Sequence, residues 1–103
     1  MLRVRKENAV HTELIHVGFG NILAMNKVVA IVTPGSAPLK RLMEEAGGKG
    51  MLVDMTNGKR TKAIIIMDSG HLALTAIGSR TIAARVEASR NGSFLGQIKR
   101  LKE

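Results

Sequence analysis

The sequence predicts an α+β domain in which a mixed, mainly antiparallel sheet with one β-hairpin is covered by two short helices. Three observations lead to this prediction. Short β-branched and aliphatic runs recur along the chain, two segments between them have the apolar spacing of a helix, and an Asn-Gly pair separates two apolar runs. With 103 residues, 45% of them apolar, the chain has room for one such domain.

The first third of the chain predicts an arm and two strands. Residues 1–12 have neither helical nor strand periodicity, which predicts a mobile basic arm. A short strand is expected over 14–17, ended by Gly18-Phe19-Gly20-Asn21. Residues 22–27 fit either a helical turn or the start of a strand. The run Val-Val-Ala-Ile-Val at 28–32 is typical of a strand that is buried on both faces.

A helix is expected over 37–46, after the break at Thr33-Pro34-Gly35. Ser36 is placed to cap it, and Pro38 falls in the first turn, where a missing N–H costs little. Gly47 and Gly48 end the pattern. The spacing of three apolar side chains predicts the buried face of this helix: Leu39, Leu42 and Met43.

The apolar runs 51–55 and 63–67 flank Asn57-Gly58, a strong predictor of a type I′ hairpin turn, because Asn and Gly tolerate positive φ best. A two-residue loop there would place Thr56 opposite Lys59, and this pair would set the register of the two strands. Further pairs in that register are Asp54 with Thr61 and Leu52 with Ala63.

Three cations follow this turn within four residues: Lys59, Arg60 and Lys62. Strand alternation would put Arg60 and Lys62 on one face. Burying such unpaired charges costs several kcal/mol each, so the tip must face water or an anion. An ordinary solvated turn has the same composition, but the net charge of +8 favours the anion site.

The last third predicts a strand, a helix and a tail. A turn at Asp68-Ser69-Gly70 leads into a strand over 71–77, and Ser79 can cap a helix over 80–89. The predicted organisation is therefore an arm (1–12), one domain (13–89) and a basic tail (90–103).

Composition excludes several classes of protein. The chain has no cysteine, so disulfides and thiolate metal sites are excluded. No signal peptide and no run near the ~20 apolar residues of a membrane span are present, which predicts a cytoplasmic protein without a membrane partner. The basic balance favours nucleic acid as the partner but does not distinguish DNA from RNA.

Catalytic and cofactor motifs are weak. Gly18-Phe19-Gly20 resembles a dinucleotide-binding loop, but Leu23 replaces the third glycine; the glycines are expected to serve backbone geometry, with Phe19 as a core or interface plug. The remaining candidates lack the spacing of a site: the histidines 11, 16 and 71 for a metal, the acids Asp54 and Asp68, and the hydroxyls Ser36 and Ser69. We expect no enzyme, no cofactor and no small-molecule ligand.

Three blocks of sequence resemble the RemA family, the bacterial extracellular matrix regulatory proteins. The first is Ile-His-Val-Gly-Phe-Gly-Asn-Ile at 15–22, the second spans 24–42 and includes Val-Thr-Pro-Gly-Ser-Ala-Pro-Leu, and the third spans 50–69 and includes Met-Thr-Asn-Gly-Lys-Arg-Thr-Lys. The resemblance covers about residues 13–86. It implies a small DNA-binding transcriptional regulator connected with extracellular matrix and biofilm, without enzymatic activity, whose subunits form a head-to-tail ring of seven or eight.

The resemblance also implies which residues contact DNA. The family's basic positions fall on Lys27 and on Lys59 and Arg60, with Lys62 close by. Lysine stands at 27 and 59 where the family usually has arginine, so these positions keep the charge but lose the bidentate fork. The leading hypothesis is a regulator that contacts the backbone of duplex DNA. The alternatives are an RNA- or other polyanion-binding module and an oligomeric scaffold whose charge gives only solubility.

Overall fold

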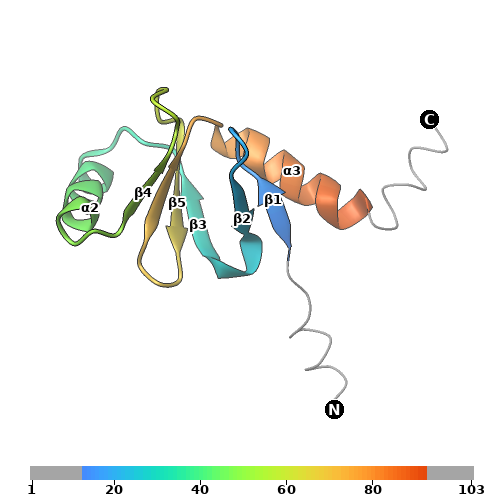
Figure 1. The fold of residues 1–103 in the computed structure, drawn as a ribbon, viewed down its shortest axis with the longest axis horizontal. Helices are drawn as coiled ribbons and strands as arrows, with labels where there is room; N and C mark the ends of the chain where they lie inside the picture. The colour runs from blue at the N-terminus through green and yellow to red at the C-terminus, as the bar shows by residue number, and fades with distance from the viewer. Residues whose placement is uncertain (1–12, 93–103) are drawn as a thin grey trace, which may run out of the picture.

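The computed structural model describes residues 13–92, which form an α+β fold (Figure 1). The expected arm at 1–12 and most of the expected tail lie outside this part of the chain. Two sheets contain the strands in this range, and two longer helices and one 3-10 helix accompany them. In chain order the elements are β1 Leu14–His16, β2 Ile22–Ala24, η1 Met25–Lys27, β3 Val28–Val32, α2 Ala37–Gly48, β4 Leu52–Met55, β5 Ala63–Met67, β6 Leu72–Thr75 and α3 Ser79–Gly92.

The main sheet has four strands in the order β3-β5-β6-β4. Strand β5 pairs antiparallel with β3 and with β6, whereas β4 pairs parallel with β6. Strands β1 and β2 form a separate antiparallel ribbon, with Ile15 opposite Leu23. The segment 22–27, which fitted both a strand and a helical turn, contains one of each: β2 and then η1.

The expected hairpin between residues 51–55 and 63–67 is wrong. Strand β6 lies between β4 and β5, so the partner of Leu52 is Leu72 and the partner of Ala63 is Thr75. Residues 59–62 belong to a loop and not to a strand, so alternation does not decide their faces. The hairpin of the main sheet joins β5 to β6 instead.

Strand β3 has the expected bounds but not the expected burial. It is an edge strand, and its register shifts at a bulge between Val28 and Ala30, which leaves Val29 66% exposed. The strands covered on both faces are β5, where Ile64 and Ile65 are fully buried, and its neighbour β6.

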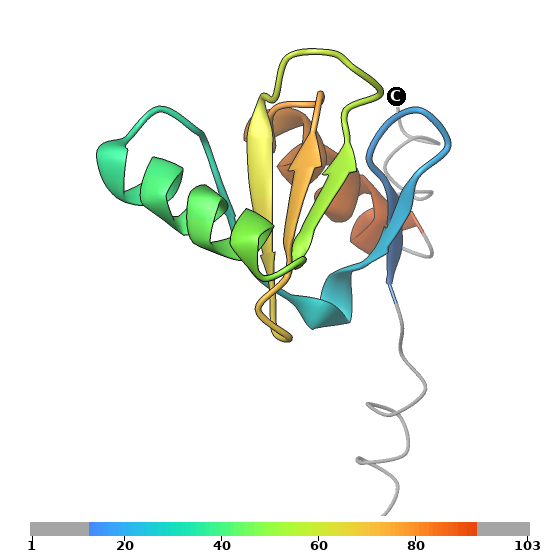
Figure 2. The ribbon, with the colours of Figure 1, turned by 60° about the vertical axis from the view of Figure 1, so that its left-hand side comes forward.

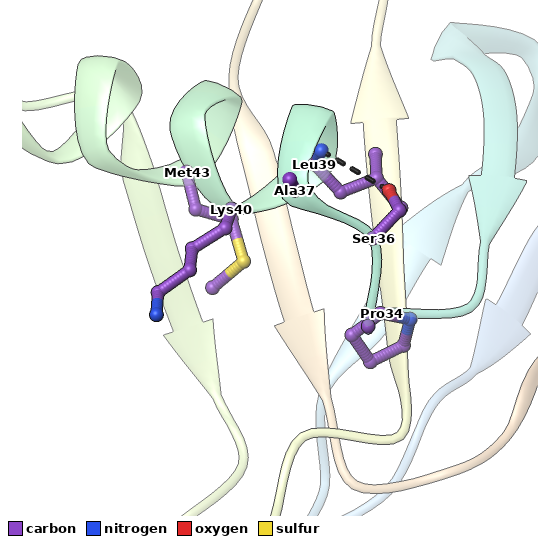
Figure 3. Close-up of a pocket in the computed structure, with 7 residues that line it drawn as sticks. Pro34, Ser36, Ala37, Leu39, Lys40 and Met43 are labelled. Carbon is purple, nitrogen blue, oxygen red and sulfur yellow. Dashed lines mark hydrogen bonds between the residues drawn. The ribbon is translucent and has the colours of Figure 1, made fainter.

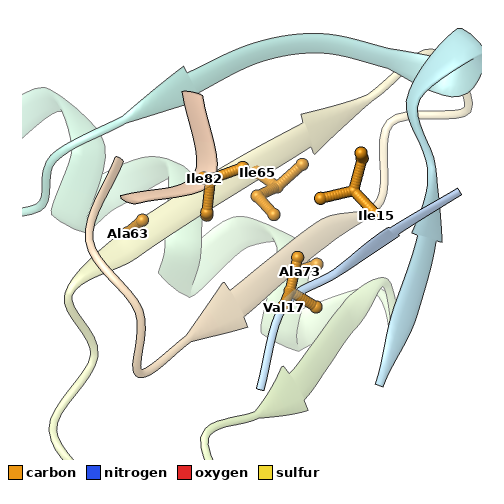
Figure 4. Close-up of a cluster of buried hydrophobic side chains, with 6 residues drawn as sticks. All are labelled: Ile15, Val17, Ala63, Ile65, Ala73 and Ile82. Atoms are coloured by element: carbon orange, nitrogen blue, oxygen red, sulfur yellow. The ribbon is translucent and has the colours of Figure 1, made fainter. Parts of the chain in front are cut away.

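The molecule has three layers, with the main sheet between α2 on one face and the β1–β2 ribbon with α3 on the other (Figure 1). Alternation along β5 supplies both cores, since Ile64 faces α2 and Ile65 faces the ribbon. On the ribbon side, strands and helix contribute one buried cluster (Figure 4): Ile15, Val17, Ala63, Ile65, Ala73 and Ile82.

Helix α2 begins as expected, because the Leu39 amide donates to the Ser36 hydroxyl at 3.3 Å. It continues through both glycines and ends at Gly48. Leu39 and Met43 pack on the sheet, but the buried position expected for Leu42 is wrong: this side chain is 37% exposed, and Ala46 is buried in its place.

Helix α3 begins at Ser79 and runs past the expected end at 89 to Gly92. Ser79 is thus the first helical residue, and its hydroxyl lies 3.3 Å from the Thr33 hydroxyl. Arg85 donates a hydrogen bond to the His16 carbonyl in β1 at 2.9 Å, and Arg90 forms a salt bridge with Glu13, just before β1, at 2.9 Å. These two contacts hold α3 against the first strand.

Candidate nucleic-acid interface

Residues 56–62 form the loop between β4 and β5 and carry three of the four expected contact residues. Figure 2 shows this loop standing above one end of the main sheet. Strand β4 ends there and β5 begins there, but the two strands are not neighbours, so the loop must cross over the end of β6, which lies between them. The basic tip is therefore presented by a crossing loop and not by a two-stranded ribbon.

The loop is fixed where it leaves β4. One carboxylate oxygen of Asp54 accepts the Thr56 hydroxyl at 2.6 Å and the Thr56 amide at 2.9 Å. Because these hydrogen bonds stabilise the ionised form, the hydroxyl first and then the amide, the pKa of Asp54 lies below its usual value. Thr56 is only 3% exposed, so the loop starts from a buried anchor.

The Asn57-Gly58 pair adopts the backbone that its sequence predicts. Asn57 has φ +55° and Gly58 has φ +81°, and the Lys59 amide donates to the Thr56 carbonyl at 2.9 Å. This is a tight turn with two left-handed central residues. It reverses the chain locally and directs it into the cationic residues, although the flanking strands do not pair.

The far end of the loop is fixed by β6. The Lys62 amide donates to the Thr75 carbonyl at 2.8 Å, beside the Ala63–Thr75 pair with which the β5–β6 ladder begins. Thr75 is fully buried, and its hydroxyl donates to the Ile77 carbonyl at 2.8 Å. Both ends of the loop are thus tied to the core, so its exposed cations are held at one edge of the subunit.

Lys59, Arg60 and Lys62 are all exposed. Within residues 13–92 none of the three makes an ion pair, and the salt bridge in that range joins Arg90 to Glu13 at a different site. The acid beside the loop, Asp54, is engaged by Thr56. Among the described residues, no ion pair neutralises the positive charge of the loop, so this charge is available to an anionic partner.

Lys27 is exposed at the other end of the sheet. It closes η1, and its carbonyl accepts a hydrogen bond from the Asp68 amide at 2.8 Å, just after the last residue of β5. Lys62 lies just before the first residue of the same strand. The structure therefore brings Lys59, Arg60 and Lys62 together but does not bring Lys27 to them within one subunit. Figure 2 shows the β4–β5 loop and the turn before β3 at opposite ends of the main sheet.

A contact that the sequence did not predict joins the β1–β2 loop to the end of the sheet that carries the β4–β5 loop. The side-chain amide of Asn21 donates to the Gly18 carbonyl at 3.0 Å and to the Met55 carbonyl at 3.4 Å. Met55 is the last residue of β4, so this loop adjoins the start of the basic loop. Asn21 follows a glycine in a loop motif, but its partner is distant in sequence and only the fold identifies it.

The candidate catalytic residues do not converge. Asp54 is at the loop end of β4 and Asp68 follows β5 at the opposite end of the sheet. The Ser69 hydroxyl lies 2.7 Å from His71 Nδ1, a pairing that the sequence did not predict, and this contact closes the exposed β5–β6 turn. In the described part of the chain, no three His, Asp or Glu side chains are grouped to hold a metal ion.

Neither helix in the described range, α2 nor α3, is long and apolar enough to cross a membrane.

Comparison with known proteins gives a family match and several relatives. Residues 14–86 match the RemA-like family, described as extracellular matrix regulatory protein A-like. A "Putative regulatory protein" of Dehalococcoides mccartyi strain BAV1 is 57% identical over 86 residues, which cover 84% of this chain and 90% of the relative. Proteins that are also named putative regulatory proteins, from Carboxydothermus hydrogenoformans and Clostridium acetobutylicum, are each 49% identical, over 77% and 79% of this chain and 91% and 88% of their own lengths.

Proposed function

Because this chain belongs to the RemA-like family, we propose that its regulatory role is exerted as a cytoplasmic transcriptional regulator that binds duplex DNA without enzymatic activity. One observation carries the proposal. The β4–β5 loop holds three exposed cations, which form no ion pair with the described residues, on a backbone anchored at both ends. Such a loop loses little conformational freedom on binding, so its charge can be used for affinity.

The chemistry of the loop fits the phosphate backbone. Lys59 and Lys62 supply compact point charges, whereas Arg60 supplies a planar fork that can bind one phosphate with two hydrogen bonds. Contacts of this kind position a protein on the duplex without reading the bases. Selectivity for a target would then come from the shape and bending of the DNA, or from contacts that Arg60 makes to a guanine edge.

Several copies of the loop are needed for strong binding. One loop neutralises few phosphates, but repeated loops on a homo-oligomer contact one duplex together and convert weak contacts into high avidity. Self-association is supported by unusually exposed apolar side chains, including Val29 at 66% on the edge strand β3 and Leu14 at 60% on β1. A head-to-tail ring of seven or eight subunits would repeat the loop at regular intervals.

Lys27 is proposed as a second and separate phosphate contact. Since it lies at the opposite end of β5 from the loop, a duplex that touches both must run along the sheet or pass over the rim of the assembly. This geometry suits DNA that is wrapped or bent around an oligomer.

Binding to single-stranded nucleic acid is the second candidate, and one observation favours it: Phe19 is 53% exposed and its loop adjoins the start of the basic loop. Proteins that hold single strands usually stack successive bases on several aromatic side chains. Phe19 is the one aromatic residue among positions 13–92, so a stacking surface of that kind is not formed there. Duplex DNA needs only the charge.

Gel shifts at matched salt with a DNA duplex, its separate strands and a structured RNA test the proposal. Each phosphate that is neutralised on duplex DNA should steepen the plot of log K against log salt by about 0.9. We expect the duplex to bind best, with a steep slope that reflects contacts from several subunits. Preferential binding of the single strands or of RNA would replace this function by the second candidate.

A further inference from the structure

The β1–β2 loop displays an apolar side chain on a constrained backbone. Phe19 has φ +54°, a left-handed conformation that is uncommon for residues other than Gly, Asn and Asp, and its side chain is 53% exposed. The loop is held by hydrogen bonds from the Val17 amide to the Asn21 carbonyl and from the Asn21 amide to the Gly18 carbonyl, each 2.9 Å. A strained and exposed aromatic side chain contributes little to the stability of its own subunit, so we infer that Phe19 contacts another molecule.

An open pocket lies on the other flank of the molecule, at the first turn of α2. It encloses about 510 Å³ and is lined by the β3–α2 connection and the α2 N-terminus, from Pro34 to Met43. Figure 3 shows the Met43 and Lys40 side chains extending from the same side of α2, with the Pro34 ring on the connection that leads into the helix. Leu39 and Met43 also pack on the sheet core, so the pocket has an apolar and well-supported base.

The two features are placed for contact between copies of the chain. Figure 2 shows the β1–β2 loop and the first turn of α2 on opposite flanks, with the basic loop between them. Both lie toward the same end of the sheet, since Asn21 contacts the end of β4 and Pro34 follows the end of β3 that pairs with the start of β5. We call the exposed Phe19 side chain the knob and the Pro34–Met43 pocket the socket. A knob on one flank and a socket on the other allow a heterologous, head-to-tail contact between subunits.

We propose that Phe19 of one subunit inserts into the Pro34–Met43 pocket of the next, and that this contact assembles the protein. The inference rests on the self-association in the proposed function and names the residues that form it. The pocket has ample room for a benzyl side chain. Lys40 at its edge can place an ammonium over the ring face, an arrangement that favours an aromatic side chain over an aliphatic one.

Neighbouring residues extend the same contact. Leu14 and Ile22 lie on the outward face of the ribbon that carries Phe19 and are 60% and 50% exposed. Repetition of this lateral contact would present every basic loop toward the same side of the assembly, which is the arrangement that avid DNA binding needs.

Two variants test the contact without harming the subunit fold. Phe19→Asn removes the knob, and Asn tolerates the left-handed conformation better than Phe. Ala37→Glu places a charge in the socket; Ala37 is exposed at the start of α2, whose first turn has no acidic residue, so the carboxylate also favours the helix. Ala83→Glu on the exposed face of α3 is the matched control.

Light scattering at micromolar concentration, without DNA, gives the result. We expect wild type and Ala83→Glu to be oligomeric and both interface variants to be dissociated, because loss of a buried Phe raises the Kd of each contact by about ten- to one-hundred-fold. Circular dichroism should show unchanged secondary structure. A 1:1 mixture of the two interface variants should give a dimer and nothing larger, since one knob and one socket remain functional in the pair.

A photo-crosslinking phenylalanine analogue at position 19 should attach to a peptide that contains residues 34–43 of a second chain. A monomeric wild type, an oligomeric Phe19→Asn or Ala37→Glu variant, or a crosslink to another region would overturn the contact. These measurements need no DNA, so they are independent of the DNA-binding proposal. Oligomers that depend on Phe19 but do not bind a duplex would leave this inference standing and reject the proposed function.

Discussion

Lys27 and Lys62 flank the same strand: the Lys27 carbonyl accepts the amide of Asp68 just after β5, and the Lys62 amide donates to Thr75 just before it. A five-residue strand spans about 17 Å, so the two expected contact sites of one subunit are about that far apart at least. A short stretch of DNA backbone at the β4–β5 loop does not reach both. The path of the duplex therefore decides whether Lys27 participates.

For Lys27→Ala we expect a loss of duplex affinity that adds to the loss from Arg60→Ala, because the two side chains meet different phosphates and share no neighbour. The plot of log K against log salt should become shallower by about 0.9 for each subunit that contacts DNA through Lys27. Titrations of both single variants and of the double variant measure this. Unchanged affinity of Lys27→Ala would confine the interface to the loop end of the sheet.

The buried hydrogen bonds of Thr56 predict a measurable pKa change. In Thr56→Val the hydroxyl that donates to Asp54 is lost with little change in shape, so the pKa of Asp54 should rise toward its usual value. NMR titration of the Asp54 carboxyl carbon tests this. An unchanged pKa would show that the hydroxyl does not control the carboxylate.

The same pair sets the direction of an acid effect. Because the pKa of Asp54 is lowered in the folded protein, its contribution to stability is fully present above the pKa of the unfolded chain, about 3.9, and is lost as the pH falls through the folded value. The start of the loop should therefore loosen below about pH 4, seen as faster hydrogen exchange at the Thr56 amide. Thr56→Val should show a smaller change over that range.

The β1–β2 loop predicts different responses at two neighbouring glycines. Gly18 has φ +103°, and a Cβ there would lie 3.1 Å from Ile77 Cδ1, whereas Gly20 has φ +78° and open space around it. We expect Gly18→Ala to lower the free energy of unfolding by about 2–3 kcal/mol and Gly20→Ala by about 1 kcal/mol. Urea unfolding at one protein concentration compares them. Equal losses would show that Ile77 yields without cost.

The loss of stability when an aliphatic side chain is truncated should follow its burial in the structure, and not its place in the apolar spacing of a helix. Ile64→Ala removes a fully buried side chain between α2 and the sheet and should cost about 2–5 kcal/mol. Leu42→Ala, at 37% exposure, should cost clearly less within the subunit. Denaturant midpoints measured in the Phe19→Asn background separate this effect from assembly. A cost for Leu42 equal to that for Ile64 would contradict the burial in the structure.

Much of the fold follows from local sequence. The Ser36 cap, the left-handed Asn57-Gly58 pair and the bounds of β3 are each decided by neighbouring residues, and each was predicted. Strand pairing is not local in this way. The Asn-Gly turn has the predicted backbone, but the parallel pairing of β4 with β6, as in Leu52 with Leu72, places a strand where the hairpin partner was expected.

The burial of each strand could not be predicted from local sequence either. The runs 28–32 and 63–67 are both nearly all apolar, yet the first forms a sheet edge with Val29 exposed and the second forms the sheet centre. Their local composition does not distinguish them, because pairing with β6 decides the order. The basic loop was predictable, since three cations in four residues need solvent wherever the strands run. The distance of Lys27 from that loop depends on the direction of β5 and was not predictable.

The most direct test of the central claim is a fluorescence anisotropy titration of duplex DNA with wild type, Arg60→Ala and the control Arg41→Ala, an equal charge change on the exposed side of α2. Light scattering first confirms that all three have the same oligomeric state, since exposed charges contribute little to stability. We expect Arg60→Ala to bind at least tenfold more weakly at moderate salt and with a shallower salt dependence, while Arg41→Ala stays near wild type. Wild-type affinity of Arg60→Ala at the same oligomeric state would contradict the assignment of the β4–β5 loop as the DNA-binding site.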